Sequence, residues 1–310
     1  MNINISFEWN KTDLGPTAVF CNFYEKIKVL RPDINFNYID SPKIRLPGSN
    51  TNRKYGALYM HIENPENDKS LLVSYYDILT EIFYYAPFTG IDLRRLRAIY
   101  SSIGVISDDN EILPIDYINY TPIGYMTAPR TEELVQKYYH LNLPKKIPQR
   151  LLFRGQMATP FRYHLLSDPR FDAIDRSGPN SNVTLEEYIQ ALASEKINLS
   201  LNGHGELCHR DMEILGLGNV LLRPKLTTKF YEPLVPDVHY IGVEYDDLPK
   251  GQANHSALAN RIFDKFNQIK DNTDFLDFVG KNARAWFERN GTIDANGEIL
   301  VKVVDFNKLN

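Results

Sequence analysis

The residues best suited to chemistry lie between Lys196 and Asp247. An apolar stretch, Ile197–Leu201, leads into a turn with two glycines, and an amphipathic stretch with Arg210 near its start follows. The backbone N–H groups of such a turn, the positive end of the next helix and an arginine together bind anions such as a diphosphate. The spacing matches neither the GxGxxG nor the GxxxxGKS/T motif. The predicted anion site consists of Asn202, Gly203, His204, Gly205 and Arg210.

A second candidate is the tripeptide Phe153–Arg154–Gly155, which ends an apolar strand pattern. An arginine at the carboxyl end of a strand suits a phosphate, and a following glycine lets the ligand approach the backbone. The alternative is an arginine in a structural ion pair. Three residues alone favour that alternative.

A third candidate, Asp77, follows the apolar stretch Leu71–Tyr75. A carboxylate at such a strand end can deprotonate a hydroxyl nucleophile. The alternative is that Asp77 caps a helix beginning at Ile78, and the local pattern favours this cap.

No metal site is predicted. His204 and His209 lack the paired spacing and third ligand of a metal centre. The acidic pairs Asp108–Asp109 and Asp246–Asp247 sit among turn residues, which favours solvated loop charges.

Alternating strand and helix patterns must position these residues. The first half opens with the strand Ile3–Trp9, the helix Ala18–Leu30 and the strand Ile34–Ile39. The second half has strands at Leu151–Phe153, Phe171–Ile174, Ile197–Leu201, Val220–Leu222 and His239–Val243. Further expected elements are the strand Ile123–Met126, a helix Thr131–His140 capped by Thr131, a helix Leu185–Glu195 capped by Thr184, and a last strand Ile299–Val304.

The order of these elements predicts an α/β fold with two Rossmann-like, doubly wound domains. Leu141–Gln149 carries two prolines and no periodicity, so it is interpreted as the linker. The predicted domains are residues 1–148 and 149–310. Two such domains imply a cleft between them, which is the default binding site.

Composition limits the classes of function. The chain has 310 residues, 43% hydrophobic and 24% charged, which is typical of a globular protein. A formal charge of −4 argues against a surface built for nucleic acid. Two cysteines, no signal-peptide pattern and no apolar run of about 20 residues indicate a cytoplasmic protein with at most peripheral membrane association.

Four features follow one another along the second half in a specific order. They are Phe153–Gly155 with Arg162 after it, Asn198–Gly203 continuing to Arg210, Gly216–Leu222, and Phe230–Leu234 followed by His239–Val243. In this order they resemble glycosyltransferase family 90, which contains capsule-associated proteins and Rumi-type protein O-glucosyltransferases. In the first half, Leu71–Asp77 is similar to the family strand that ends in its proposed catalytic aspartate.

The resemblance implies a GT-B fold, a nucleotide-sugar donor (expected to be a UDP-sugar), inversion at the anomeric carbon and no required metal or other cofactor. It implies that Asp77 is the general base, and that Arg154 and Arg210, with the Gly203–Gly205 backbone, hold the diphosphate. The expected acceptor is a hydroxyl of a glycan.

The chain departs from the family at residues 156–158, where Gln-Met-Ala replaces the usual Ser-Arg-Thr. One basic donor contact is therefore missing or supplied elsewhere, with Arg162 and Arg223 as the candidates. Two alternatives stay open: a catalytically silent nucleotide- or glycan-binding protein, and a viral-type sugar transferase acting on nucleic acid.

Overall fold

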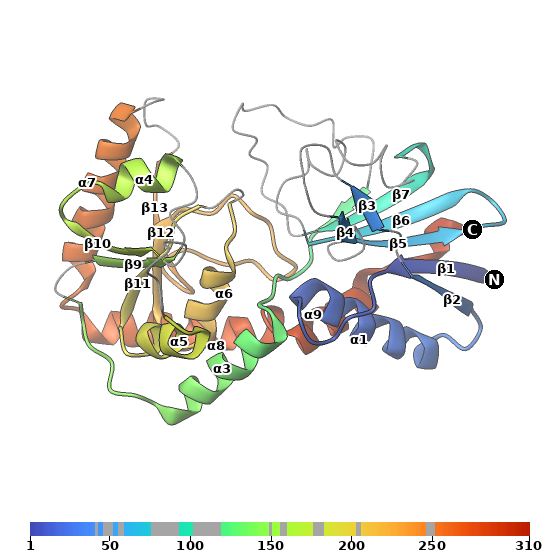
Figure 1. Cartoon of the computed structure of the whole chain (residues 1–310), viewed down its shortest axis with the longest axis horizontal. Coiled ribbons are helices and arrows are strands. Elements are labelled where there is room, and N and C mark those ends of the chain that lie inside the picture. The colour runs from blue at the N-terminus through green and yellow to red at the C-terminus, as the bar shows by residue number, and fades with distance from the viewer. Residues whose placement is uncertain are drawn as a thin grey trace. The chain divides into compact units, whose positions relative to one another are not determined.

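The computed structural model describes residues 1–40, 43–45, 52–54, 59–75, 93–101, 119–148, 151–155, 160–175, 183–202, 206–245 and 252–310. The chain forms two compact units (Figure 1). Unit 1 comprises Met1–Arg130, Thr227–Pro233 and Asn290–Asn310, and unit 2 comprises Thr131–Leu226 and Leu234–Arg289.

Unit 2 is built on a five-stranded parallel sheet with the order β10-β9-β11-β12-β13. Its strands are β9 (Leu151–Gly155), β10 (Phe171–Asp175), β11 (Ile197–Leu199), β12 (Val220–Pro224) and β13 (Ile241–Val243). Parallel strands are covered on both faces, which explains why they read as short apolar runs rather than alternating patterns.

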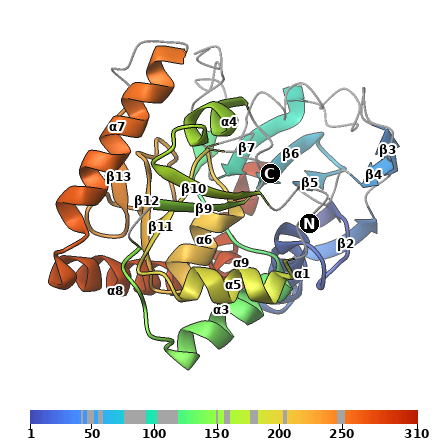
Figure 2. The same ribbon diagram turned by 60° about the vertical axis from the view of Figure 1, so that its left-hand side comes forward.

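Helices cover both faces of this sheet because strands are added on one side of β9 first and on its other side afterwards. The connection from β9 to β10 contains α4 (Pro160–Leu166), and the connections to β11 and β12 contain α5 (Leu185–Ala193) and α6 (His209–Gly216). Right-handed crossovers in opposite directions place α4 on one face and α5 and α6 on the other (Figure 2). On the α4 face, α7 (Gln252–Ile269) and α8 (Thr273–Asn290) complete the apolar core with Leu258, Phe266 and Leu276.

The predicted start of α5 is confirmed. Thr184 Oγ1 accepts a hydrogen bond from the Glu187 N–H at 3.2 Å, and a Glu187 carboxylate oxygen accepts from the Thr184 N–H at 2.7 Å. This reciprocal capping box satisfies two N–H groups that the helix itself leaves unpaired.

Unit 1 contains a six-stranded sheet with the order β2-β1-β5-β6-β7-β8. The strands are β1 (Asn2–Phe7), β2 (Asn35–Asp40), β5 (Tyr59–Asn64), β6 (Lys69–Ser74), β7 (Leu96–Ser101) and β8 (Asn119–Thr121). The helix α1 (Gly15–Leu30) connects the parallel neighbours β1 and β2. Only β5 runs against its neighbours among these six strands, because four residues join it to β6 and permit only a hairpin. A short pair, β3 (Lys43–Arg45) and β4 (Asn52–Lys54), and the 3₁₀ turn η2 (Leu93–Arg95) complete the described elements of this region.

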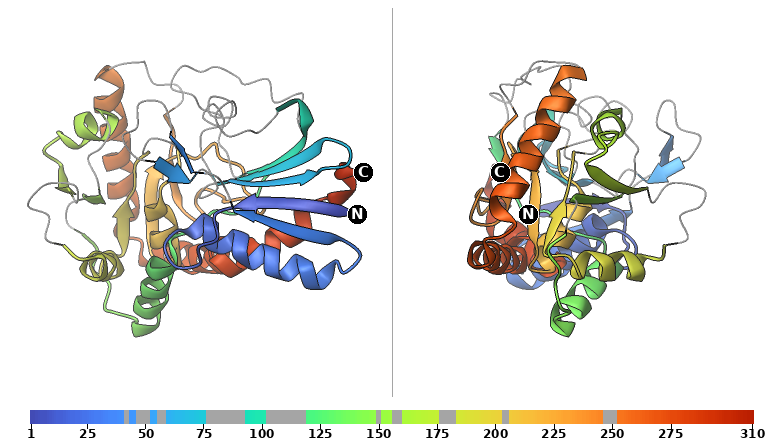
Figure 3. Two further views of the ribbon diagram at one scale, coloured as in Figure 1. Left: turned by 45° about the vertical axis from the view of Figure 1, so that its right-hand side comes forward. Right: turned by 90° about the vertical axis from the view of Figure 1, so that its left-hand side faces the viewer.

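The C-terminal segment belongs to unit 1, where α9 (Ile293–Val303) lies beside α1 (Figure 3). Lys26 Nζ on α1 donates to Asp294 at 2.9 Å and to Glu298 at 2.5 Å. The 3₁₀ turn η4 (Phe306–Leu309) follows, and the Asn64 amide donates to the Leu309 carbonyl at 2.9 Å. The division into units therefore differs from the predicted domains 1–148 and 149–310, since the chain end packs on the first helix.

Three sequence predictions about elements are wrong. Ile299–Val304 is helical up to Val303, because Thr292 caps α9 and the helix buries Ile299 and Leu300 in the core of unit 1. Ile123–Met126 is not a strand, and the edge strand β8 ends just before it. Helix α3 (Pro129–Leu141) begins two residues before the predicted cap Thr131, with proline in the first turn, where its missing N–H costs nothing.

The predicted α/β class is confirmed, with two units that each contain their own sheet. None of the helices in the described ranges is both long enough and apolar enough to cross a membrane.

Candidate functional site

The candidate site lies at the carboxyl ends of β9 and β11 in unit 2. The chain leaves β9 toward β10 on one side and returns to β11 on the other, so this is the point where the strand order reverses. Open parallel sheets bind ligands at this position because the loops from the two strands diverge there. The sequence predictions Arg154, Gly155, Arg162, Asn202, Arg210 and Arg223 all lie on or next to these strand ends and the helices that follow.

Arg210 is the central residue of the site. It is the second residue of α6 and only 7% exposed, and its Cζ lies 4.2 Å from the centre of the Phe153 ring. Its Nε and Nη1 atoms are buried and have no hydrogen-bond partner among the described residues. Arg210 does interact with Tyr188, but buried N–H groups without a partner are costly, so these two nitrogens are suited to an anion.

Gly155 makes room for Arg210. A Cβ atom at position 155 would lie 1.6 Å from Arg210 Nη2 and 2.6 Å from Cζ. Any side chain there would displace the guanidinium. The sequence interpretation assigned Gly155 to the approach of a ligand, and the structure shows that the arginine itself uses that space.

Arg154, the neighbour of Gly155 on β9, forms an ion pair, and its phosphate contact stays a prediction. Its guanidinium lies 3.9 Å from the Glu195 carboxylate, which is a long ion pair. Its Nε is buried without a hydrogen-bond partner in the described part of the chain. Burial lowers the pKa of Arg154, and Glu195 partly opposes that effect. Arg154 therefore retains capacity for an anion.

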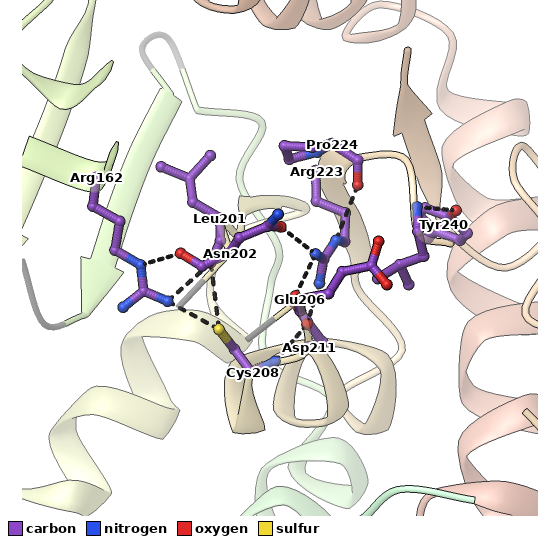
Figure 4. A network of polar contacts seen from close by, with 10 residues as sticks. Arg162, Leu201, Asn202, Glu206, Cys208, Asp211, Arg223, Pro224 and Tyr240 are labelled. Carbon is purple, nitrogen blue, oxygen red and sulfur yellow. Dashed lines mark hydrogen bonds and ion pairs between the residues drawn. The ribbon is translucent and has the colours of Figure 1, made fainter. Parts of the chain in front are cut away.

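Arg162 fixes the backbone that follows β11 (Figure 4). Its Nε donates to the Asn202 carbonyl at 2.8 Å, and its Nη2 donates to the Leu201 carbonyl and to Cys208 Sγ, each at 2.9 Å. The side chain is 6% exposed, and burial lowers its pKa. These contacts occupy the guanidinium with the chain itself, and a donor contact by Arg162 stays a prediction.

Arg223 supports the same turn from β12 and is completely buried (Figure 4). It forms an ion pair with Asp211, and its Nη2 donates to Asn202 Oδ1 and to the Glu206 carbonyl, each at 2.7 Å. Burial acts to lower the pKa of Arg223, but Asp211 and the neighbouring Cys208, Glu206 and Tyr240 together outweigh burial, and the pKa is raised. A donor contact by Arg223 also stays a prediction, and in this structure a ligand cannot reach its side chain.

Asp211 is a residue of the site that the sequence interpretation missed. Its side chain is fully buried, and its Oδ2 accepts from the Cys208 N–H at 2.9 Å as well as from Arg223. The detectable signal was its position three residues after Cys208, which is the spacing of a capping box. The partnership with Arg223 leaves no local signal.

Tyr188 and Glu213, beside Arg210, are two further residues of the site that the sequence analysis did not identify. The Tyr188 hydroxyl donates to Glu213 Oε2 at 2.8 Å, and both side chains are buried. Burial and then the Glu213 charge raise the pKa of Tyr188, while Arg210 acts in the opposite direction. The negative charge of Glu213 thus lies one helical turn from Arg210.

Several predicted residues lie outside the described part of the chain. They are Asp77, Gly203, His204 and Gly205, together with residues 156–158. The strand before Asp77 is described as far as Tyr75, whose hydroxyl lies 3.1 Å from Asn296 Oδ1. Across the described ranges, no group of three or more His, Cys, Asp or Glu side chains is placed to hold a metal ion.

Comparisons with known proteins give only distant likenesses. No protein-family model and no curated protein matches the chain. Among solved structures, similar ones include an alpha-glucosyltransferase in complex with UDP-glucose and DNA containing an abasic site, with 8% identity, a TM-score of 0.47 and coverage of 98% of this chain and 99% of that one. Another is WaaG, a glycosyltransferase involved in lipopolysaccharide biosynthesis, with 10% identity, a TM-score of 0.44 and coverage of 96% of both chains. A third is an alpha1,3-fucosyltransferase, with 10% identity, a TM-score of 0.33 and coverage of 96% of this chain and 92% of that one. All three TM-scores are below 0.5, so the activity of this chain is inferred from its own residues.

Proposed function

We propose that this protein is a glycosyltransferase that takes its sugar from a nucleotide diphosphate donor, with a UDP-sugar as the expected donor. The observation that carries the proposal is Arg210, which is 7% exposed, lies against Gly155 and has two nitrogens without a partner among the residues that the structure describes. This arrangement stands at the reversal point of a parallel sheet, where nucleotides bind.

A diphosphate fits this site better than a neutral ligand does. Hydrogen bonds between a guanidinium and a phosphate oxygen are charge-assisted and stronger than neutral ones. Arg210 and Arg154 both retain buried nitrogens without a partner in the described residues, so each would be able to donate to a bound phosphate. The backbone of residues 203–205 would complete the site.

The four arginines then divide into two roles. Arg210 and Arg154 would bind the diphosphate, while Arg162 and Arg223 hold Leu201, Asn202 and Glu206 through their carbonyls and the Asn202 side chain. This division accounts for the basic donor contact that the family's arginine near residue 157 would supply. In this proposal Arg162 and Arg223 replace that arginine indirectly, by fixing Leu201, Asn202 and Glu206 rather than by contacting the donor.

The reaction follows from these roles. Asp77 would accept the proton of an acceptor hydroxyl, whose oxygen attacks the anomeric carbon. The bond from that carbon to the β-phosphate oxygen breaks, the configuration inverts and the nucleoside diphosphate leaves. Arg210 and Arg154 stabilise the charge that develops on the leaving diphosphate, so the proposal needs no metal ion. A positioned base contributes roughly 10²–10⁴-fold to the rate.

The assignment of the units follows the same scheme. Unit 2 would bind the donor, and unit 1, which contains the strand leading to Asp77, would bind the acceptor. The acceptor class proposed is a glycan hydroxyl, and the two-unit arrangement would be that of a GT-B enzyme.

Nucleotide binding tests the first step. We expect UDP and UDP-glucose to raise the melting temperature of the purified protein, since a ligand at 100 times its Kd stabilises by about 2.7 kcal/mol. Arg210→Ala should weaken UDP binding by roughly 10- to 150-fold, the loss of a charged hydrogen bond. Arg210→Lys should be intermediate, because an ammonium keeps the charge but loses the fork. Arg31→Ala is the matched control, because Arg31 lies in unit 1, is partly exposed and is paired with Asp33.

Turnover tests the second step and separates the alternatives. Asp77→Asn should bind UDP as the wild type does and lose sugar transfer. If the wild type binds UDP but neither transfers the sugar nor slowly hydrolyses UDP-glucose, the result would instead support a catalytically silent nucleotide-binding protein. Equal UDP affinity of the wild type and Arg210→Ala would reject the proposed donor site.

A further inference from the structure

Trp9 is an exposed tryptophan held in a fixed position. The chain has two tryptophans, and they differ completely in burial: Trp286 is 0% exposed and Trp9 is 43% exposed. Trp9 comes two residues after the carboxyl end of β1. A single exposed aromatic side chain is common on a protein surface, and what distinguishes Trp9 is the set of rings that hold it in place.

Three aromatic rings orient the Trp9 indole. Phe7 stacks on it at 5.7 Å with an angle of 29°, and Tyr24 and Tyr38 meet it edge-on at 5.9 Å and 5.4 Å. Phe7 is fully buried and Tyr24 nearly so. The indole is therefore a rigid surface, and a ligand that stacks on it loses little side-chain entropy in the protein.

The polar groups linked to this ring and its neighbours include three carboxylates and two lysines, Lys11 and Lys28, the latter 5.3 Å from the Tyr24 ring, so carboxylates are in the majority. The Tyr38 hydroxyl lies 3.1 Å from Asp40 Oδ1, and the Asn10 amide donates to Asp13 at 2.9 Å. Lys11 lies 5.8 Å from the indole but is paired with Glu25 at 2.6 Å. Hydrogen bonds from Asn10 and then Thr12 keep the pKa of Asp13 below its usual value, so this carboxylate stays ionised.

These features select the chemistry of the ligand. A pyranose ring has an apolar C–H face that can lie on an indole and hydroxyls at its edge that donate to carboxylate and amide oxygens. A nucleic acid base can also stack on a tryptophan, but its phosphates would meet the carboxylates of Asp13, Asp40 and Glu25. The observations therefore favour a neutral sugar.

We infer that Trp9, with Tyr38, Asp40, Asn10 and Asp13 around it, binds a neutral pyranose ring of the acceptor glycan. The inference rests on the proposed function, in which unit 1 binds the acceptor. It deepens that function by naming the residue that recognises the acceptor and the kind of sugar ring that it binds. Position supports it as well, since β1 ends at the same edge as the parallel strand β6 that leads toward Asp77.

Tryptophan fluorescence provides the assay, because Trp286 is fully buried and silent toward surface ligands. The probes are cellohexaose, maltohexaose, laminarihexaose and chitohexaose at millimolar concentration, with a short single-stranded oligodeoxynucleotide as the competing class. We expect at least one hexasaccharide to shift or quench the emission of the wild type. The variant Trp9→Phe, which retains only Trp286, should show no such change.

Affinity variants give the quantitative test on the same full-length protein. Trp9→Ala should weaken the responding hexasaccharide about 10-fold or more by calorimetry, as expected for a central aromatic contact. Trp9→Phe should recover part of that loss because a ring remains. Phe278→Ala is the matched control, since Phe278 is an exposed aromatic on α8. Urea unfolding of each variant separates loss of binding from loss of folding.

The outcomes separate this inference from the donor site. UDP affinity should be the same in Trp9→Ala as in the wild type. UDP binding with no hexasaccharide response, or equal sugar affinity of the wild type and Trp9→Ala, overturns the inference and leaves the donor site standing. A Trp9-dependent response to the oligodeoxynucleotide alone also overturns it. A Trp9-dependent sugar response in a protein that binds no nucleotide rejects the proposed function instead.

Discussion

The substitution Gly155→Ala tests the donor site without changing any charged residue. The new Cβ would lie 1.6 Å from Arg210 Nη2, so the guanidinium must retreat by roughly 2 Å to reach an ordinary contact. Arg210 is 7% exposed, with Phe153 against its face, and has little free space to retreat into. We expect overpacking to lower the free energy of unfolding by about 1–3 kcal/mol.

The effect on ligand binding should be larger than this loss of stability suggests. A displaced guanidinium loses its hydrogen bonds to the diphosphate, and a hydrogen bond to a charged group contributes about 1.5–3 kcal/mol. UDP affinity should therefore fall roughly 10- to 150-fold, measured by calorimetry at a temperature where the variant is folded.

A double-mutant cycle makes the test specific. With Arg210→Ala in the background, Gly155→Ala should cost almost nothing in stability or UDP affinity, because the clash is gone. Gly242→Ala is the control in the same sheet, where a Cβ would meet only ordinary contacts of 3.4 Å or more. Additive effects of Gly155→Ala and Arg210→Ala, or wild-type affinity of a folded Gly155→Ala, would refute the assignment of Arg210.

Two further predictions concern stability. Asp211→Asn leaves Arg223 buried without its counter-charge, so it should lower the free energy of unfolding by about 3–5 kcal/mol in urea titrations. The control Glu25→Gln, at the exposed pair with Lys11, should change the free energy of unfolding by only about 0–1 kcal/mol. Similar losses in both variants would contradict the role of burial. Burial, and then Lys196, lowers the pKa of Lys145 to about 8, so its protonation opposes folding: this contribution is absent above the unfolded pKa of about 10.4 and grows as the pH falls to 8. Relative to Lys145→Met, the wild type should therefore lose about 1–2 kcal/mol of stability between pH 10.5 and pH 8, after allowance for partial exposure. If the free energies of unfolding of the two proteins differ by the same amount at both pH values, the hydrogen bonds from Lys145 to the Leu217 and Gly218 carbonyls keep it charged instead.

Much of unit 2 could be predicted from local pattern. The strands β9 to β13 are short apolar runs bounded by turn residues, and Thr184 with Glu187 is a local capping signal. These features depend on neighbours within a few residues of one another. The position of Arg210 in the first turn of α6 follows from the same local order.

The errors arise where distant contacts decide the conformation. The run Ile299–Val304 is rich in β-branched residues and favours a strand locally, but the Thr292 cap and the contacts of α9 with α1 make it helical. The direction of β5, by contrast, could have been read from the sequence. Only four residues separate it from β6, and a parallel connection needs a dozen or more.

The roles of the arginines could not be divided from sequence alone. Arg154, Arg162, Arg210 and Arg223 look equivalent as basic residues near predicted strand ends. The structure separates them by whether their N–H groups are already used. The partners are carbonyls of Leu201, Asn202 and Glu206 and the carboxylate of Asp211, which no spacing rule connects to them.

This unequal use of similar side chains is itself an argument for a ligand. Arg162, Arg210 and Arg223 are each less than 10% exposed, yet only Arg210 keeps two buried nitrogens unpaired within the described structure. Folding has already removed water from its guanidinium, so an arriving anion gains the charge interaction without that part of the desolvation cost. Preorganised charge of this kind is most effective where negative charge increases during a reaction. A departing diphosphate meets that condition, because its charge grows as the glycosidic bond breaks.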